Sequence, residues 1–480
     1  MEIIFRVART RRLRRYEVMD PCDCLLALVH GLISPIRSKR WRGTGLSRGA
    51  AATIALLLTP WATPALSSSP RAQPGGNGVR LVSTQFTLVN ESETFQGILS
   101  GAPTSTTFLP LDSDPMAAQI MHQEQARHVT ISAILGLHGD FPPLALAGDL
   151  QDVTPLLNTL KARGFRDSFV KLSMMGSKTK HYYVPFVQAT CVLAVNKKAL
   201  RYLPKGANMD ALTYDEWIAW GKSMKKATGK PMIGLPAGPA GLIDRFIQGY
   251  LYPSFTHSSG VREFRSAAAV RMWQKVKELW AVTSTQSTNY NFMQAPLLGG
   301  SVWVAWDHVA RLIDAVTRKP NDFELIPAPY GPSGRGFMLV IAGIAIPKGA
   351  PNVKGAESLI SYLTKPAQQL AVLEKLGFFP ATNVTIPSRL PQGIRLEAIA
   401  VQKQAQSKRT VLALLPIGLG THGGDFNLVF VDTFHRIVLD NENIKAVLND
   451  EARFLRGVMK TTGAKCWLPD RPSSGPCPVN

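Results

Sequence analysis

Several turns of the chain place aromatic rings next to hydrogen-bonding side chains, directly after apolar runs. Val129–Leu137 leads into His138-Gly139-Asp140-Phe141, and Ser301–Trp306 leads into Asp307-His308. Rings stack on apolar faces, whereas carboxylate, amide, hydroxyl and imidazole groups bind hydroxyls through directional hydrogen bonds. Together, such rings and polar groups can bind a small molecule that has both apolar faces and hydroxyl groups, without forming a covalent bond. The stacking candidates are Phe141, Trp306 and Phe426, and the hydrogen-bonding candidates are Gln85, Asp140, Gln188, Thr190, Asp307 and His308.

Each candidate also has a purely structural explanation. A tryptophan is more often part of a core than a binding platform, Asp140 can cap the helix after it, and His308 can be a neutral core histidine. Gln188 and Thr190 can simply continue a strand. His138, Asp140, Asp307 and His308 are metal-ligand types, but they form two sequence-distant pairs without local ligand spacing. We therefore expect no metal and no cofactor.

The sequence contains neither the H-E-x-x-H motif of metalloproteases nor a Walker loop. The glycine-rich stretch 331–336 precedes a strand instead of following one. We therefore expect a protein that is not an enzyme. A secreted carbohydrate-active hydrolase with paired carboxylates remains the alternative, because the carboxylate separation of about 5–9 Å that it needs is a structural quantity.

Composition argues against nucleic-acid binding despite a net charge of +21. Residues 1–72 hold 12 Lys/Arg and 4 Asp/Glu, which leaves 42 and 29 in the remainder, without a long basic run. No nucleic-acid-binding motif accompanies this charge, so a solvated basic surface explains it. A chain of 480 residues is long enough for two domains.

The N-terminus is typical of an export signal. Arg40, Arg42 and Arg48 precede the apolar stretch Ala50–Leu58, and small residues follow at 62–67. The stretch is too short for a membrane span. A lipid anchor would need a cysteine at its exit, and none is present there. We expect residues 1–72 to be removed or disordered, and the mature protein to be exported to the periplasm or the extracellular space.

The rest of the chain alternates strands and helices. Apolar, β-branched runs at 79–86, 129–137, 182–196, 301–306 and 337–346 alternate with helical patterns, and Thr213 with Glu216 forms a predicted helix start. Such alternation predicts an α/β fold with largely parallel sheets. Ligands in such folds bind outside the carboxyl ends of strands, where the candidate turns lie.

Cysteine usage agrees with an oxidising compartment. Cys466 and Cys477 bracket a Pro/Gly-rich tail and are predicted to form a disulfide, whereas Cys191 inside an apolar strand is predicted to be a buried, inert thiol. Cys22 and Cys24 lie in the predicted leader.

Several motifs in order resemble the extracellular solute-binding proteins of ABC transporters, family 1, the maltodextrin-binding-like group. Tyr183–Leu200 is similar to the first hinge segment of that family, Thr213–Trp217 to its T-W-D-E-F/W helix start, and Gly299–Trp306 to its G-x-x-A-M strand. The segment 336–383, a strand followed by Pro347-Lys348-Gly349 and a helix, resembles its second interlobe crossing. The resemblance covers residues 79–450.

The resemblance implies a two-lobe, periplasmic-binding-protein-like fold of the class II type, with a central cleft and hinge strands. Lobe one would comprise 79–185 plus 345–385, lobe two 195–335 plus 386–450, and a disulfide-bonded tail 451–480. It also implies a small solute, most often a sugar, bound by closure of the lobes, and docking to membrane permease subunits. We expect a monomer that meets the membrane only through its permease, with Asp140 and Trp306–Asp307 as the best site candidates.

Overall fold

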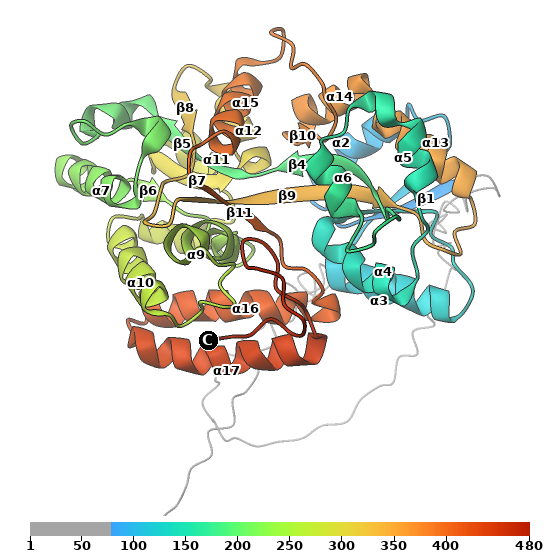
Figure 1. The fold of residues 1–480 in the computed structure, drawn as a ribbon. Helices are drawn as coiled ribbons and strands as arrows, with labels where there is room; N and C mark the ends of the chain where they lie inside the picture. Colours follow the sequence, from blue (N-terminus) through green and yellow to red (C-terminus); the bar gives the residue numbers. More distant parts are fainter. Residues whose placement is uncertain (1–77) are drawn as a thin grey trace, which may run out of the picture. The chain divides into compact units, whose positions relative to one another are not determined.

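One long strand, β9 (Arg335–Ala345), connects the two halves of the described chain (Figure 1). The structure is a computed structural model that describes residues 78–480, apart from the side chain of Asp114. The first residues of β9, Arg335–Leu339, pair with β11, and residues from Val340 onward pair with β4 and β3. The predicted export signal, Cys22 and Cys24 lie outside the described residues.

The strands form two sheets that differ in size. The first has the order β10-β4-β9-β3-β1-β2, with β11 attached to β9, and the second has the order β6-β7-β5-β8. The strands are β1 (Val79–Ser83), β2 (Thr106–Pro110), β3 (Ala133–Leu137), β4 (Val184–Ala189), β5 (Cys191–Asn196), β6 (Ile233–Gly234), β7 (Val304–His308), β8 (Phe323–Ile326), β10 (Phe379–Pro380) and β11 (Thr410–Leu414).

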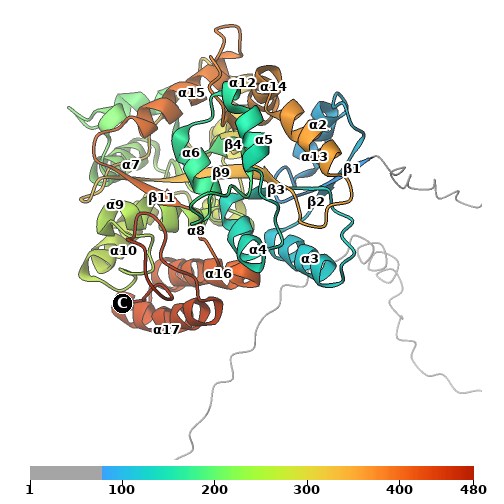
Figure 2. The same ribbon diagram turned by 45° about the vertical axis from the view of Figure 1, so that its right-hand side comes forward.

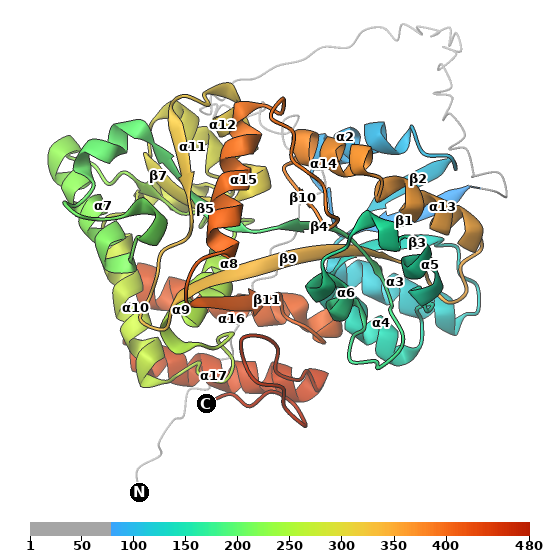
Figure 3. The same ribbon diagram turned by 45° about the horizontal axis from the view of Figure 1, so that its top comes forward.

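Helices surround each sheet, and we keep the names lobe one and lobe two for the halves around the first and second sheet (Figure 3). Their exact boundaries stay a prediction. Lobe one contains α2 (Val89–Leu99), α3 (Ser113–Gln125), α4 (Phe141–Ala147), α5 (Thr154–Thr159), α6 (Asp167–Ser173), α13 (Val353–Leu363) and α14 (Pro366–Leu376). Lobe two contains α7 (Tyr214–Thr228), α8 (Ile243–Phe246), α9 (Tyr252–Thr256), α10 (Ala267–Trp280), α11 (Gln294–Gly299), α12 (Ile313–Arg318), α15 (Gln392–Ala405), α16 (Gly423–Phe434) and α17 (Ile444–Thr462).

The α/β class is confirmed, but the prediction of largely parallel sheets is wrong. The ladder β2-β1-β3 is parallel, whereas β9 is antiparallel to both β3 and β4, and β5 is antiparallel to both β7 and β8. The reason is that the crossing strands run between the lobes and enter each sheet against its neighbours. Two local predictions hold: the segment 337–346 lies in β9 apart from Ile346, and Thr213 with Glu216 forms a capping box at the start of α7.

Apolar packing continues through the hinge. One buried cluster joins Phe86 and Phe186 of lobe one to Val192 and Ala305 of lobe two. The lobes are therefore joined by packed side chains as well as by the backbone of the crossing strands. Among the described residues, no helix combines the length and the apolar character that a membrane crossing requires.

The predicted disulfide between Cys466 and Cys477 is confirmed, and it closes a loop that is attached to lobe two. The Asp470 carboxylate in this loop accepts hydrogen bonds from Ser258 Oγ at 3.0 Å and from the Ser259 amide at 2.9 Å. The predicted tail started at residue 451, but α17 continues to Thr462, so the irregular tail begins at Gly463. Cys191 is buried and free, as predicted.

Replacing both Cys466 and Cys477 by serine should lower the free energy of unfolding by about 2–3 kcal/mol. The disulfide spans a sequence separation of 11, and closing a loop of that size restricts the unfolded chain by about this amount. Urea unfolding with and without a reductant measures the effect. The wild type should lose stability on reduction and the double variant should not; equal responses to the reductant would contradict the prediction.

A carboxyl group without a partner lies inside lobe two. Glu397 on α15 has 0% of its surface exposed, and neither of its side-chain oxygens has a hydrogen-bond partner among the described residues. Helix α15 packs against α12 and β8. Burial raises the pKa of Glu397 well above its ordinary value, because water no longer stabilises the charged form.

Glu397→Met should raise the free energy of unfolding at neutral pH by about 1–2 kcal/mol, because an apolar side chain of similar size removes an uncompensated polar group. The folded state holds the proton more tightly than the unfolded state. Stability from this group is therefore present below the unfolded pKa of about 4.3 and is lost as pH rises toward the folded pKa.

Urea unfolding between pH 4 and pH 8 checks this prediction. The wild type should show a decline that the variant lacks, and Glu374→Met, at an exposed position of α14, serves as the control. Parallel pH curves for wild type and Glu397→Met would show that burial of Glu397 has no energetic consequence.

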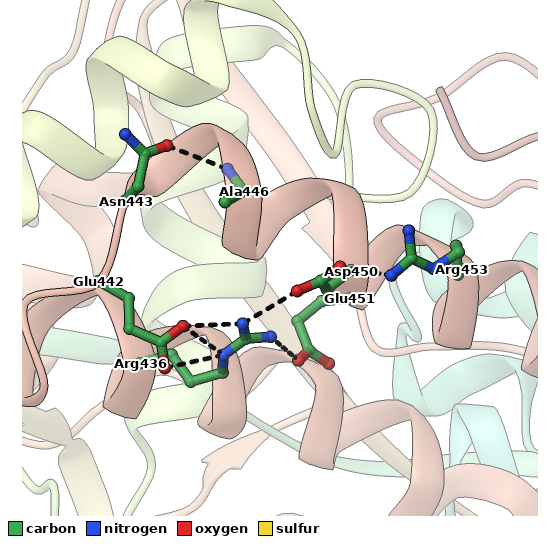
Figure 4. A network of polar contacts seen from close by, with 7 residues as sticks. All are labelled: Arg436, Glu442, Asn443, Ala446, Asp450, Glu451 and Arg453. Atoms are coloured by element: carbon green, nitrogen blue, oxygen red, sulfur yellow. Dashed lines mark hydrogen bonds and ion pairs between the residues drawn. The ribbon is translucent and has the colours of Figure 1, made fainter. Parts of the chain in front are cut away.

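An ion network joins the end of α16 to α17 (Figure 4). Arg436, in the π-helical turn η9 (His435–Leu439), donates to Glu442 Oε2 at 2.8 Å, to Asp450 Oδ2 at 3.0 Å and to Glu451 Oε1 at 2.7 Å. Glu451 is only 3% exposed. Asn443 caps α17 by accepting from the amide of Ala446, so the network fixes the connection where α17 begins.

Candidate functional site

A cavity of about 250 Å³ lies over the crossing strands and is lined from both lobes. Lobe one contributes Thr84 and Gln85, which follow β1, and Glu91 in the first turn of α2. Lobe two contributes Arg245 from α8 and Arg311 from the short helix η7 (Val309–Arg311). We call this cavity the central compartment. Its position at the carboxyl ends of β1 and β7 is the position expected for ligands in open α/β sheets.

The central compartment also reaches the residues where the chain crosses between the lobes. Cys191 begins β5 and pairs with His308 at the end of β7, and both line the cavity. Tyr250 lies in the π-helical turn η5 (Ile247–Leu251) between α8 and α9. Its hydroxyl accepts a hydrogen bond from the Cys191 amide at 2.7 Å and lies 3.0 Å from Thr190 Oγ1. This side of the cavity is therefore held by buried hydrogen bonds across the crossing.

Two further cavities adjoin the central compartment and share its lining, so the three form one cleft. The first flanking compartment, of about 320 Å³, shares Leu137, Arg245 and Leu415 with it. The second flanking compartment, of about 280 Å³, shares Leu88, Glu91, Ala310 and Arg311.

The lobes touch at the first flanking compartment. Gly139, in the short helix η1 (His138–Asp140) of lobe one, lies against Pro416 of lobe two, and a Cβ at position 139 would be 2.3 Å from the Pro416 carbonyl oxygen. Figure 2 shows α16 of lobe two beside α3 of lobe one, in agreement with their contacts. The structure therefore represents the lobes in contact along this edge.

Asp140 lines the first flanking compartment, where it is held by lobe one. Its Oδ2 accepts hydrogen bonds from Thr84 Oγ1 at 2.9 Å and from the Leu137 amide at 2.8 Å. Burial raises the pKa of Asp140, and this effect exceeds that of the hydrogen bonds, which lower it. The hydrogen bonds fix its orientation and the junction between β1 and β3.

Asp307 and His308 occupy different environments although they are neighbours. Asp307 is fully buried, with Oδ2 accepting from the Met293 amide and Oδ1 from the His308 amide, each at 2.7 Å. Burial raises the pKa of Asp307 to about 6, against the charge of Arg311, which lowers it. Burial, together with Arg311, lowers the pKa of His308 to about 3, so this imidazole is neutral at physiological pH.

The structure brings Gln85, Asp140 and His308 to the cleft and places Asp307 behind it. The three stacking candidates do not reach the cleft, because each has 0% of its surface exposed. Trp306 packs against Phe246 and Tyr250, Phe141 stacks on Tyr183, and Phe426 packs against Phe430 and Trp467. Their role as stacking platforms is therefore corrected to that of core residues.

Gln188 and Thr190 face a different cavity. Both line a groove of about 830 Å³ between α6 and α15. Thr190 Oγ1 donates to the Met338 carbonyl at 3.0 Å and accepts from Gln404 Nε2 at 2.8 Å, and Gln188 Nε2 donates to the Pro380 carbonyl at 3.4 Å. These contacts join the crossing strands to their neighbours, so in this conformation neither side chain belongs to the cleft.

The sequence interpretation missed Arg245, Arg311 and Glu91. Each is a single charged residue in a helical segment, a pattern that also describes ordinary surface positions. The one available signal was the position of Arg311, three residues after the predicted turn residue His308. Within residues 78–480, no three His, Cys, Asp or Glu side chains are arranged so that they could hold a metal ion.

Comparisons with known proteins agree with this architecture. The family model described as bacterial extracellular solute-binding protein matches residues 130–370. No curated protein sequence matches the chain. The maltose-bound MalE3 of T. maritima has 16% identity and a TM-score of 0.64, over 79% of this chain and 99% of that chain.

Two other solved structures are similar. The GacH receptor of Streptomyces glaucescens, studied with acarbose, has 16% identity and a TM-score of 0.61, over 80% of this chain and 99% of its own. UgpB of Mycobacterium tuberculosis, in complex with glycerophosphocholine, has 17% identity and a TM-score of 0.61, over 81% of this chain and 100% of its own. At such identities these structures show the shared two-lobe fold alone. Because the family model covers half of the sequence, the chain belongs to the bacterial extracellular solute-binding protein family.

Proposed function

We propose that the protein is the extracytoplasmic receptor of an ABC importer and that it binds a small carbohydrate by closure of its lobes. The observation that carries the proposal is the central compartment, since Thr84, Gln85 and Glu91 of lobe one face Arg245 and Arg311 of lobe two across one cavity. A solute that contacts both lobes binds the closed state more tightly than the open state and shifts the population toward it.

The relatives support the carbohydrate assignment. The T. maritima protein is described as maltose-bound and the S. glaucescens receptor as bound to acarbose. Gln85, Asp140 and His308 offer the amide, carboxylate and imidazole groups that bind sugar hydroxyls. The proposed site is the cleft formed by the three compartments, and the proposed partners are the permease subunits of the importer.

A thermal-shift screen of the purified protein against mono- and oligosaccharides tests the proposal. A bound solute should raise the melting temperature in proportion to the logarithm of its concentration. Incubation with chromogenic glycosides distinguishes the alternative, because a hydrolase releases product and a receptor does not. Turnover of a glycoside, or the absence of any stabilising sugar, would contradict the proposed function.

A further inference from the structure

A buried glutamine connects two polar residues that line the first flanking compartment from lobe two, Arg245 and Asn427. Gln248 lies in the π-helical turn η5, is 2% exposed and does not itself line the cleft. Its Oε1 accepts a hydrogen bond from Arg245 Nη1 at 3.2 Å, and its Nε2 donates to Asn427 Oδ1 at 3.1 Å. Gln248 therefore links α8 to α16 behind the wall of the compartment.

The arginine determines the direction of both hydrogen bonds in this row of three side chains. A guanidinium has donors and no acceptor, so the oxygen of the Gln248 amide must face Arg245. The nitrogen of the same amide then faces Asn427, which must accept with its own oxygen. The polar group that Asn427 has left for a solute is its NH2 group, which is a donor. Lobe two therefore offers hydrogen-bond donors from both side chains to this compartment.

Lobe one contributes two carboxyl groups to the lining of the same compartment, Asp112 and Asp140. Burial raises the pKa of Asp140, and the positive charge of Arg245 is among the effects that oppose this rise, so the two groups lie within electrostatic reach of each other. Within residues 78–480 no hydrogen bond or ion pair joins them directly, and the carboxylate nearest to the Arg245 guanidinium is its neighbour Asp244, at 3.5 Å. The compartment therefore separates donors of lobe two from acceptors of lobe one.

We infer that Gln248 is a positioning residue, which makes the first flanking compartment selective for the hydroxyl groups of an uncharged solute. Such a hydroxyl accepts from Arg245 or Asn427 of lobe two and donates to Asp140 of lobe one. A carboxylate on the solute would accept but not donate and would lie beside the carboxylates of lobe one, and an ammonium group would donate but not accept and would lie beside the guanidinium. The hydroxyl contacts both lobes and therefore favours the closed state. This inference rests on the proposed function and specifies its substrate class.

Gln248→Glu separates the two contacts of this side chain. A glutamate keeps an acceptor for Arg245 but has no donor for Asn427, so the Asn427 amide reverses and presents its oxygen to the compartment. We expect binding to weaken about tenfold or more, because a donor to the solute is exchanged for an acceptor that faces Asp140. The measurement is calorimetric titration of the full protein with glucose, galactose, maltose and maltotriose, and the variants are compared with the sugar that binds the wild type most tightly.

Asn427→Ala shows whether the loss passes through Asn427. This variant removes the donor and should by itself weaken binding about tenfold, a result that tests the donor even where Gln248→Glu does not fold. Gln248→Glu in the Asn427→Ala background should cause no further loss, since no amide remains to be reversed. Gln274→Glu is the matched control, because it makes the same change at an exposed position of α10, and it should bind like the wild type.

Three results would overturn the inference and leave the proposed function standing. The first is wild-type affinity in Gln248→Glu or in Asn427→Ala, and the second is a further loss when Gln248→Glu is added to Asn427→Ala. The third is tighter binding of glucuronate than of glucose, since the compartment would then accept a charged group. No binding by any of the four uncharged sugars would contradict the inference together with the proposed function.

Discussion

Gly139→Ala is expected to reduce solute affinity by about 100-fold while both lobes remain folded. The new Cβ would lie 2.3 Å from the backbone oxygen of Pro416, and a backbone atom cannot rotate away as a side chain can. The lobes must separate at this edge, so the closed state becomes less populated. A penalty of about 3 kcal/mol on closure lowers the apparent affinity by about two orders of magnitude.

The measurement is a titration with whichever sugar stabilises the wild type, combined with small-angle X-ray scattering. The variant should remain at the larger radius of gyration of the open state when the sugar is added. Gly457→Ala is the control, because a Cβ at this exposed position of α17 meets no atom within 4 Å. If Gly139→Ala bound and compacted like Gly457→Ala, the contact of Gly139 with Pro416 would not belong to the closed state.

Arg436→Met is expected to lower the free energy of unfolding by about 3–5 kcal/mol, the largest stability effect predicted for this chain. Arg436 contacts three carboxylates, of which Glu451 is nearly fully buried. Removal of the guanidinium leaves these negative charges close together, and the burial of Glu451 is then no longer compensated by Arg436. Methionine keeps most of the apolar volume, so the effect reports the loss of charge and hydrogen bonds.

Chemical denaturation followed by far-UV circular dichroism measures this effect. Arg453→Met is the matched control, because Arg453 is 69% exposed and pairs with Asp450 from the surface, an arrangement that contributes less than about 1 kcal/mol. Similar midpoints for Arg436→Met and Arg453→Met would show that the buried part of the network adds no stability.

The elements of the fold were more predictable than the residues of the site. The capping box at Thr213 and Glu216 depends on contacts three residues apart, and β9 depends on a continuous apolar run, so both follow from local sequence. The direction of strand pairing does not, because it is set by how the chain returns from one lobe to the other. This is why the parallel arrangement was expected and a mixed one is found.

Trp306 illustrates why the aromatic platforms were not predictable. It precedes Asp307 and His308 at the end of a strand, but register decides its depth: Trp306 pairs with Leu193, two positions inside the sheet, whereas His308 pairs with the first residue of β5. Sequence shows the order of these residues and not where the neighbouring strand begins. Arg311 became informative only when the structure placed it in the lining of two compartments of the cleft.

The shared strand β9 also determines when this protein can fold during synthesis. Strands β3 and β4 have no direct ladder with each other and meet only through β9, which lies at residues 335–345. A nascent chain that has emerged only to residue 334 therefore lacks the central strand of its first sheet, even though most of both lobes has been translated. Pairing over such sequence separations is slow. The first sheet therefore stays incomplete until late in translation, although the strands β1 to β4 have long been synthesised.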